Sequence, residues 1–258
     1  MAGVSEPLSR KGRIAVWLLR LGLAGGLLLI WHVATMSGRV SILMLPPLAG
    51  VARQFVLILQ AGEFWDDLQV TIFEVVAAFA IAALSGCLTG YLVSRSRFQV
   101  RVLEPLLAGL YAVPVIVVYP LYVLYFGLGP ASKVALGTTI AFFPIVLNTM
   151  SGFGGVAPII VAAARSMGGH GWNMFRHVLL PAAFPVVLAG LRIGFVLSFL
   201  SIIGGEMIAS YQGIGRLIIN QAEAMNTATM YAYIVFLIAI ALMVNLLDGL
   251  LDAWGHRP

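Results

Sequence analysis

The sequence QVTIFEVVAAFAIAALSGCLTGYLV, residues 69–93, has a single acidic or basic residue, Glu74, in a run that is otherwise apolar, small or weakly polar. About 20 such residues in a helix cross a hydrocarbon core of about 30 Å. The run therefore predicts a transmembrane helix, with Glu74 shallow, one to two turns into it. Its G-x-x-x-G, Gly86 to Gly90, allows another helix to approach closely and indicates a packing face.

Similar apolar runs recur along the whole chain. Of its 258 residues, 61% are hydrophobic and 10% are charged, whereas a soluble domain has about 25% charged residues. The first run is too long for a signal peptide and no A-x-A site follows it, so we expect it to stay uncleaved. The sequence predicts an all-α polytopic membrane protein, one domain over residues 1–258, with about six spans. The expected spans are 14–36, 69–93, 102–126, 131–150, 184–209 and 231–252.

The basic residues are distributed unevenly between the two sides of this arrangement. Those on the N-terminal side are Arg10, Lys11, Arg13, Arg95, Arg97, Arg101, Arg165, Arg176 and Arg257. Those on the opposite side are Arg39, Arg53, Lys133 and Arg216. Because basic residues concentrate on the cytoplasmic side, both termini are expected in the cytoplasm. The net charge of +5 is explained by this topology and not by nucleic-acid binding.

Catalytic and cofactor motifs are missing from the sequence. The histidines show no metal-binding spacing, and neither of the two lysines belongs to a G-x-x-x-x-G-K-[ST] phosphate loop. Cys87 lies in an apolar run, where a cysteine usually packs as a small apolar residue. We therefore expect no enzyme activity, metal or cofactor in this chain, so ATP and Mg²⁺ would be bound by a partner subunit if ATP powers it.

Two segments outside the spans have helical patterns. After Pro46-Pro47, the spacing of Leu48, Val51, Phe55 and Leu59 predicts an amphipathic helix on the outer membrane surface, which either packs between spans or docks a partner.

The second segment is the cytoplasmic loop at residues 156–181. In it, Pro158 begins a helix and Gly168-Gly169 end it. A second helix is expected from about Trp172 and should stop before Pro181. Two short helices joined by a glycine turn form a protrusion that either fits a socket on a partner or simply connects two spans.

Candidate residues for a translocation pathway lie on the third and fifth spans. They are Tyr111, Pro114, Tyr119, Tyr122, Ser198, Ser201 and Glu206. Prolines are tolerated in membrane helices that line a cavity, and tyrosine hydroxyls in mid-span can bind an anion. The alternatives are interfacial anchoring and helix packing. For Glu206 the alternatives are the pathway, an outer gate or a structural hydrogen bond.

The 156–181 loop resembles that of binding-protein-dependent ABC importer permeases. Their signature E-A-A-x-x-x-G, nine residues, I-x-L-P maps with intact spacing onto Ala162-Ala163-Ala164, Gly168, Val178 and Leu180-Pro181. Ala162 replaces the glutamate and Val178 the isoleucine. Further matching stretches are similar to the nitrate, sulfonate and taurine branch: Leu45–Leu48, Leu103–Leu107, Phe126–Gly129, Phe142–Thr149, Leu188–Arg192 and Gly204–Met207. Glu74 departs from that branch, which tends to carry a basic residue there.

The resemblance implies a type I ABC importer permease fold in the inner membrane. It implies a pair of permease copies, a cytoplasmic ATPase dimer that binds ATP and Mg²⁺, and an external solute-binding protein. Coupling to the ATPase would then involve Ala163, Ala164, Gly168, Val178 and Pro181. The implied solute is an oxyanion or organosulfonate such as nitrate, taurine or an alkanesulfonate, or else a thiamine or riboflavin precursor or another small organic acid.

Other functions remain possible from the residues alone. A stand-alone secondary transporter or channel would carry internal repeats and buried ionisable relays. A membrane enzyme would pair polar residues at mid-depth. A scaffold for assembly would transport nothing.

Overall fold

The computed structural model describes residues 10–255, which within that range form helices and connecting turns without a β-strand. The chain divides into two compact units, residues 62–219 and the residues that precede and follow them. The helical architecture confirms the predicted all-α class.

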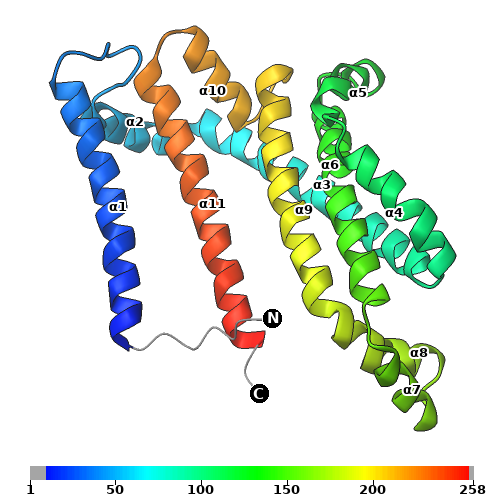
Figure 1. The fold of residues 1–258 in the computed structure, drawn as a ribbon. Helices are drawn as coiled ribbons and strands as arrows, with labels where there is room; N and C mark the ends of the chain where they lie inside the picture. The colour runs from blue at the N-terminus through cyan, green and yellow to red at the C-terminus, as the bar shows by residue number, and fades with distance from the viewer. Residues whose placement is uncertain (1–9, 256–258) are drawn as a thin grey trace. The chain divides into compact units, whose positions relative to one another are not determined.

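The core of unit 62–219 consists of three long helices: α3 (Gly62–Ser94), α6 (Pro130–Gly154) and α9 (Leu180–Ile208). Helix α6 contacts both α3 and α9, and Figure 1 shows α3 crossing the other two helices. A Cβ on Gly86 of α3 would lie 2.8 Å from Ile145 Cγ2, and one on Gly90 would lie 2.8 Å from the Val146 carbonyl oxygen. The predicted G-x-x-x-G packing face is therefore confirmed, because no side chain fits there.

A second G-x-x-x-G, which the sequence analysis did not identify, lies on α9. A Cβ on Gly190 would lie 2.5 Å from Asn148 Cβ, and one on Gly194 would lie 2.5 Å from Ile145 Cδ1. The central helix α6 is thus held at close range on two sides by glycine-rich faces.

The expected third span, 102–126, is not one straight helix. Helix α4 (Arg97–Tyr111) is followed by the 3₁₀ turn η1 (Val115–Val118) and α5 (Tyr119–Phe126), and the two parts are bent by 72°. Pro114 lies at the bend; proline has no N–H to donate and disfavours helical geometry in the residue before it. If the bent pair counts as one span, the described residues contain six candidate spans, and otherwise five.

The 156–181 loop forms two helices, as expected, but the second one continues. Helix α7 (Pro158–Ser166) is followed by α8 (Gly171–Met174), the π turn η2 (Phe175–Leu179) and α9, in an unbroken helical run from Gly171 to Ile208. The predicted stop before Pro181 is therefore wrong. The amide of Leu180 bonds to Phe175 O in the wider π turn, and this turn lets the helix continue through Pro181, which has no N–H to donate.

The other unit contains α1 (Arg10–Met36), α2 (Leu48–Gln60) and α11 (Thr227–Gly255). Helix α2 starts directly after Pro46-Pro47, as predicted, and packs on α11. Trp31 of α1 donates to Pro46 O at 2.9 Å and packs edge-on against Tyr231 of α11, with the ring centroids 5.3 Å apart.

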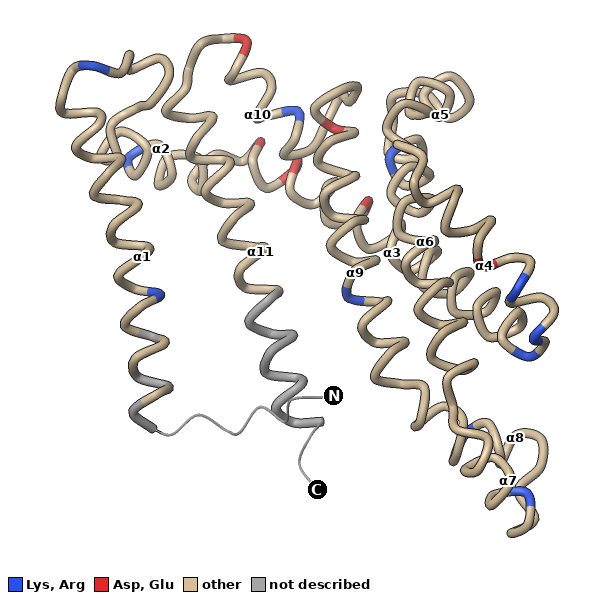
Figure 2. Tube along the Cα trace, in the orientation of Figure 1, with Lys and Arg blue, Asp and Glu red and all other residues tan. Residues whose placement is uncertain are grey.

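Charged residues lie mainly near helix ends and in loops (Figure 2). This distribution fits helices whose middle sections are in lipid. Arg257, which the charge analysis assigned to the cytoplasmic side, lies outside the described residues.

Candidate functional site

Four ionisable side chains are buried together in unit 62–219, where α3, α6 and α9 meet the segment that follows α9. Asp67 and Glu74 on α3 are 4% and 0% exposed, and Lys133 on α6 and Glu206 on α9 are 1% exposed each. We call Asp67, Thr71, Glu74, Lys133 and Glu206 the buried polar cluster. Charges buried in a membrane protein are costly and are retained where they are paired or functional.

The cluster caps the start of α10 (Ile214–Glu223). The three consecutive N–H groups of residues 213–215 donate, in order, to Asp67 Oδ1 at 2.5 Å, Thr71 Oγ1 at 2.9 Å and Glu206 Oε2 at 2.7 Å. The first N–H groups of a helix have no partner within the helix, and the positive end of its dipole favours carboxylates. Side chains of α3 and α9 therefore anchor α10 from outside.

Thr71 also joins α3 directly to α9. Its hydroxyl donates to Glu206 Oε1 at 2.7 Å, so both carboxylate oxygens of Glu206 accept a hydrogen bond. Three roles were considered for Glu206, and the hydrogen bonds of the structural role are present. The pathway and outer-gate roles stay predictions.

Lys133 binds the segments that follow α5 and α9. Its ammonium group donates to Leu128 O and Gly129 O, both at 3.0 Å, and to Ser210 Oγ at 2.9 Å. Its Nζ lies 3.4 Å from Glu74 Oε1. Lys133 had been counted among the outer basic residues, at the start of the expected span 131–150, and Glu74 had been expected one to two turns into its span. Lys133 lies in the first turn of α6, and α3 begins at Gly62, about three turns before Glu74, so Glu74 lies deeper in its helix than expected.

Tyr119 is the second predicted pathway residue that the structure brings to this region. Its hydroxyl lies 3.1 Å from Gly205 O and 3.0 Å from Ala209 O, and the side chain is buried. Tyr119 and Glu206 thus converge on residues 205–215, the end of α9 and the turn into α10.

The other five predicted pathway residues lie elsewhere in the unit. Ser198 and Ser201 are buried on α9, and the Ser201 hydroxyl donates to Leu197 O of its own helix at 2.6 Å. The Tyr122 hydroxyl bonds to Thr139 Oγ1 of α6 at 2.9 Å.

Tyr111 and Pro114 are exposed at the bend between α4 and α5. Such broken helices are tolerated in membranes where they line a cavity or pack against neighbours. The pathway assignment of these five residues stays a prediction.

The turn between α7 and α8 has the geometry that its glycines predict. Gly168 has φ +83°, a left-handed conformation that favours glycine, and Gly169 N donates to Ala164 O at 2.8 Å. Of the predicted coupling residues, Ala164 is buried, Val178 is half-buried, and Ala163, Gly168 and Pro181 are exposed. The turn therefore projects α7 and α8 as a fixed hairpin.

Aromatic rings fasten this hairpin to the ends of α3 and α6, a feature that the sequence analysis missed. The Phe175 ring lies 5.0 Å from Tyr91 of α3 and 6.0 Å from Phe153 of α6, and it stacks at 5.2 Å on Trp172. Aromatic pairs at these distances attract beyond their buried area. A force on the exposed Trp172 therefore reaches both helices through direct contacts.

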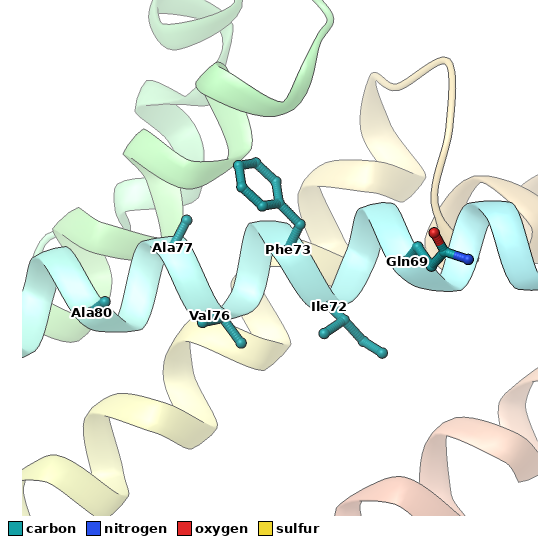
Figure 3. Close-up of a pocket in the computed structure, with 6 residues that line it drawn as sticks. All are labelled: Gln69, Ile72, Phe73, Val76, Ala77 and Ala80. Carbon is teal, nitrogen blue, oxygen red and sulfur yellow. The ribbon is translucent and has the colours of Figure 1, made fainter.

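The exposed face of α3 carries an open groove of about 390 Å³. Figure 3 shows its lining: Gln69, Ile72, Phe73, Val76, Ala77 and Ala80, all from this one helix. Only Gln69 offers a hydrogen-bonding side chain. The groove suits apolar contact and does not provide the donors that an anion site needs.

Residues 78–255 match the family described as binding-protein-dependent transport system inner membrane component. The chain is 32% identical to SsuC of Escherichia coli (strain K12), an aliphatic sulfonates transport permease, over 92% of this chain and 87% of that relative. It is 30% identical to the riboflavin transport system permease RibX of Chloroflexus aurantiacus, over 88% and 84%. It is 28% identical to the taurine transport system permease TauC of Escherichia coli (strain K12), over 93% and 87%.

Proposed function

This chain belongs to the family of binding-protein-dependent transport system inner membrane components, and on that premise we propose that it is the pathway-forming permease subunit of an ATP-driven importer. The observation that carries the proposal is the α7–α8 hairpin. It presents apolar side chains to solvent, among them Ile159, Met167 and Trp172, at 74%, 82% and 67% exposure. An exposed apolar surface on a rigid protrusion fits a protein partner.

The partner in this proposal is a cytoplasmic ATPase dimer that binds ATP and Mg²⁺. The hairpin is fixed by Gly168 and tied by Phe175 to α3 and α6. When the ATPases close on ATP, they would move the two hairpins of a permease pair together, and each hairpin would carry the ends of its helices with it. This is alternating access by rigid elements. Both termini and the hairpin lie on the cytoplasmic side of the inner membrane in this arrangement.

The proposed solute is an aliphatic sulfonate or taurine, delivered by an external solute-binding protein. Similarity to SsuC and TauC over nearly the whole chain supports this class. RibX is similar to a comparable degree, so a riboflavin-like vitamin is the alternative that a specific observation supports.

Purification of the tagged chain from its native membranes tests the proposal. We expect an ATPase with a phosphate-binding loop and a solute-binding protein to co-purify. The complex in proteoliposomes should take up alkanesulfonate or taurine only when ATP is enclosed in the lumen, on the side of the ATPase. A chain that purifies alone while a control importer keeps its ATPases would contradict the importer assignment. Uptake of riboflavin but not sulfonate would retain the importer and change the solute.

A further inference from the structure

Glu74 is the one acid of the buried polar cluster whose oxygens accept no hydrogen bond among the described residues. Its side chain is fully buried in α3. Asp67 accepts from the Gly213 amide, and Glu206 accepts from Thr71 and the Gly215 amide. A buried carboxylate without hydrogen bonds is strongly disfavoured.

Lys133 does not supply the missing hydrogen bond. Its Nζ is 3.4 Å from Glu74 Oε1, but the three hydrogens of the ammonium are directed to Leu128 O, Gly129 O and Ser210 Oγ. An ammonium has three donors and no more. Lys133 and Glu74 therefore lie within ion-pair distance of each other but share no hydrogen bond.

The net charge of the buried polar cluster also singles out the Glu74 carboxyl group. Three ionised acids and one lysine would leave a net charge of −2 among the buried side chains, from −3 and +1, and Arg216 of α10, which is partly exposed, attracts Asp67. The start of α10 contributes roughly +0.5 elementary charge, and it faces Asp67 and Glu206. Around Glu74 the charged or titratable groups are Lys133 from α6, Glu206 from α9 and Tyr119 from α5. One added proton relieves the excess negative charge.

We propose that Glu74 is a proton-binding site: in the conformation of this structure its carboxyl group is neutral and holds one proton taken from solvent. The proton gives the group a donor toward its acidic neighbour Glu206. A neutral carboxyl next to Lys133 leaves the lysine charge to balance Glu206. The neutral carboxyl group does not depend on which solute the chain carries.

Glutamine distinguishes a neutral carboxyl from an ionised one, because its amide both donates and accepts. Glu74→Gln should keep every contact of a protonated Glu74. The matched variant Glu206→Gln should not, because both oxygens of Glu206 accept hydrogen bonds and the amide group would meet a donor. In the full-length chain in lipid nanodiscs, we expect Glu74→Gln to unfold within about 2 °C of the native chain. Glu206→Gln should unfold about 5 °C or more lower.

Infrared spectroscopy of the native chain and of Glu74→Gln supplies a direct readout. At neutral pH we expect the carbonyl band of a protonated carboxyl group in the native chain, and its loss in the variant. The proposal is overturned if the two spectra agree in this band. It is also overturned if Glu74→Gln is as destabilised as Glu206→Gln, the result that an ionised pair with Lys133 requires. Stabilisation of the native chain, but not of Glu74→Gln, by sodium or potassium chloride would show a bound cation in place of the proton.

Discussion

The Thr71 side chain of the buried polar cluster joins three helices. Its hydroxyl donates to Glu206 Oε1 and accepts from the Ile214 amide, so one small group links α3, α9 and α10. Valine has nearly the same shape as threonine, but its side chain can neither donate nor accept a hydrogen bond. Removing the hydroxyl would leave a buried carboxylate oxygen and a buried amide without their partners, and each such group costs about 1–3 kcal/mol.

Thr71→Val should therefore lower the free energy of unfolding by roughly 2 kcal/mol or more. The measurement is thermal or denaturant unfolding of the purified full-length chain. Thr35→Val is the matched control, because the Thr35 hydroxyl bonds only to His32 O of its own helix at 2.8 Å and is exposed. Equal stability of the two variants would show that the Thr71 hydroxyl does not hold the cluster together.

At this scale the sequence identified one member of the cluster by its chemistry. An acid within an apolar run defaults to a functional role, and by this rule Glu206 was selected, whereas Glu74 was set aside as shallow. It did not find the partners, because Glu74, Lys133 and Glu206 are far apart in sequence and no spacing links them. Lys133 was counted only as an outer-side charge, because it lies at the start of the expected span 131–150.

Among the elements, α6 shows how the core is assembled without large side chains. Glycines of α3 and α9 allow its backbone to approach on two sides, and close contact replaces the hydrophobic effect, which is weak between helices in lipid. At Gly90 an added Cβ would lie 2.6 Å from Thr149 Cβ and 2.8 Å from Val146 O. Because one of these atoms belongs to the backbone, a rotamer change cannot relieve the clash.

Gly90→Ala should destabilise the chain by about 1–3 kcal/mol through overpacking. Gly109→Ala on α4 is the control, because nothing lies within 4 Å of the added Cβ and alanine favours a helix over glycine. We expect the control to be neutral or slightly stabilising in the same unfolding assay. A Gly90→Ala chain as stable as Gly109→Ala would argue against tight α3–α6 packing.

The loop hairpin depends on one backbone conformation. Gly168 has φ +83° and open space around its α-carbon, so a larger residue meets no clash but is strained by about 1–2 kcal/mol. Gly168→Val should reshape the α7–α8 turn while leaving the rest of the fold intact. We expect less ATPase recovered per permease, and ATP hydrolysis that no longer drives uptake.

Gly154→Ala, at the end of α6, is the control for Gly168→Val, because its added Cβ also meets nothing within 4 Å and its φ is not positive. The assays are ATPase recovery on purification and solute uptake in proteoliposomes. Unchanged solute-stimulated hydrolysis and uptake in Gly168→Val would count against a coupling role for this turn.

Sequence patterns predicted the elements better than their junctions. The G-x-x-x-G of α3, the proline start of α7 and its glycine end follow from local chemistry and were found. The bend at Pro114 and the continuous helix through Pro181 were not. Both sites contain proline, whose effect depends on whether neighbouring turns change their hydrogen bonding, as the π turn at Phe175–Leu179 does.

For the whole molecule, the number of membrane crossings depends on the bent pair α4–α5. If the pair crosses the membrane, the α3–α4 turn and the α7–α8 hairpin lie on the same side, as the distribution of basic residues predicts. If it is a re-entrant loop, α6 starts on the side where α3 ends, and the hairpin lies on the opposite side. The six-span arrangement of the proposed permease requires the first case.

Single cysteines in a Cys87→Ala background distinguish these two topologies. Arg95→Cys, in the α3–α4 turn, and Arg165→Cys, near the tip of the hairpin, replace exposed residues, and Gln212→Cys marks the turn after α9. In intact cells or right-side-out vesicles, a membrane-impermeant thiol reagent should label Gln212→Cys directly and the other two only after permeabilisation. Exposed side chains have little packing to lose, so all three variants should fold and accumulate normally. Labelling of Arg95→Cys and Arg165→Cys from opposite sides would mean that α4–α5 does not cross the membrane. The number of membrane-spanning segments among the described residues would then be five.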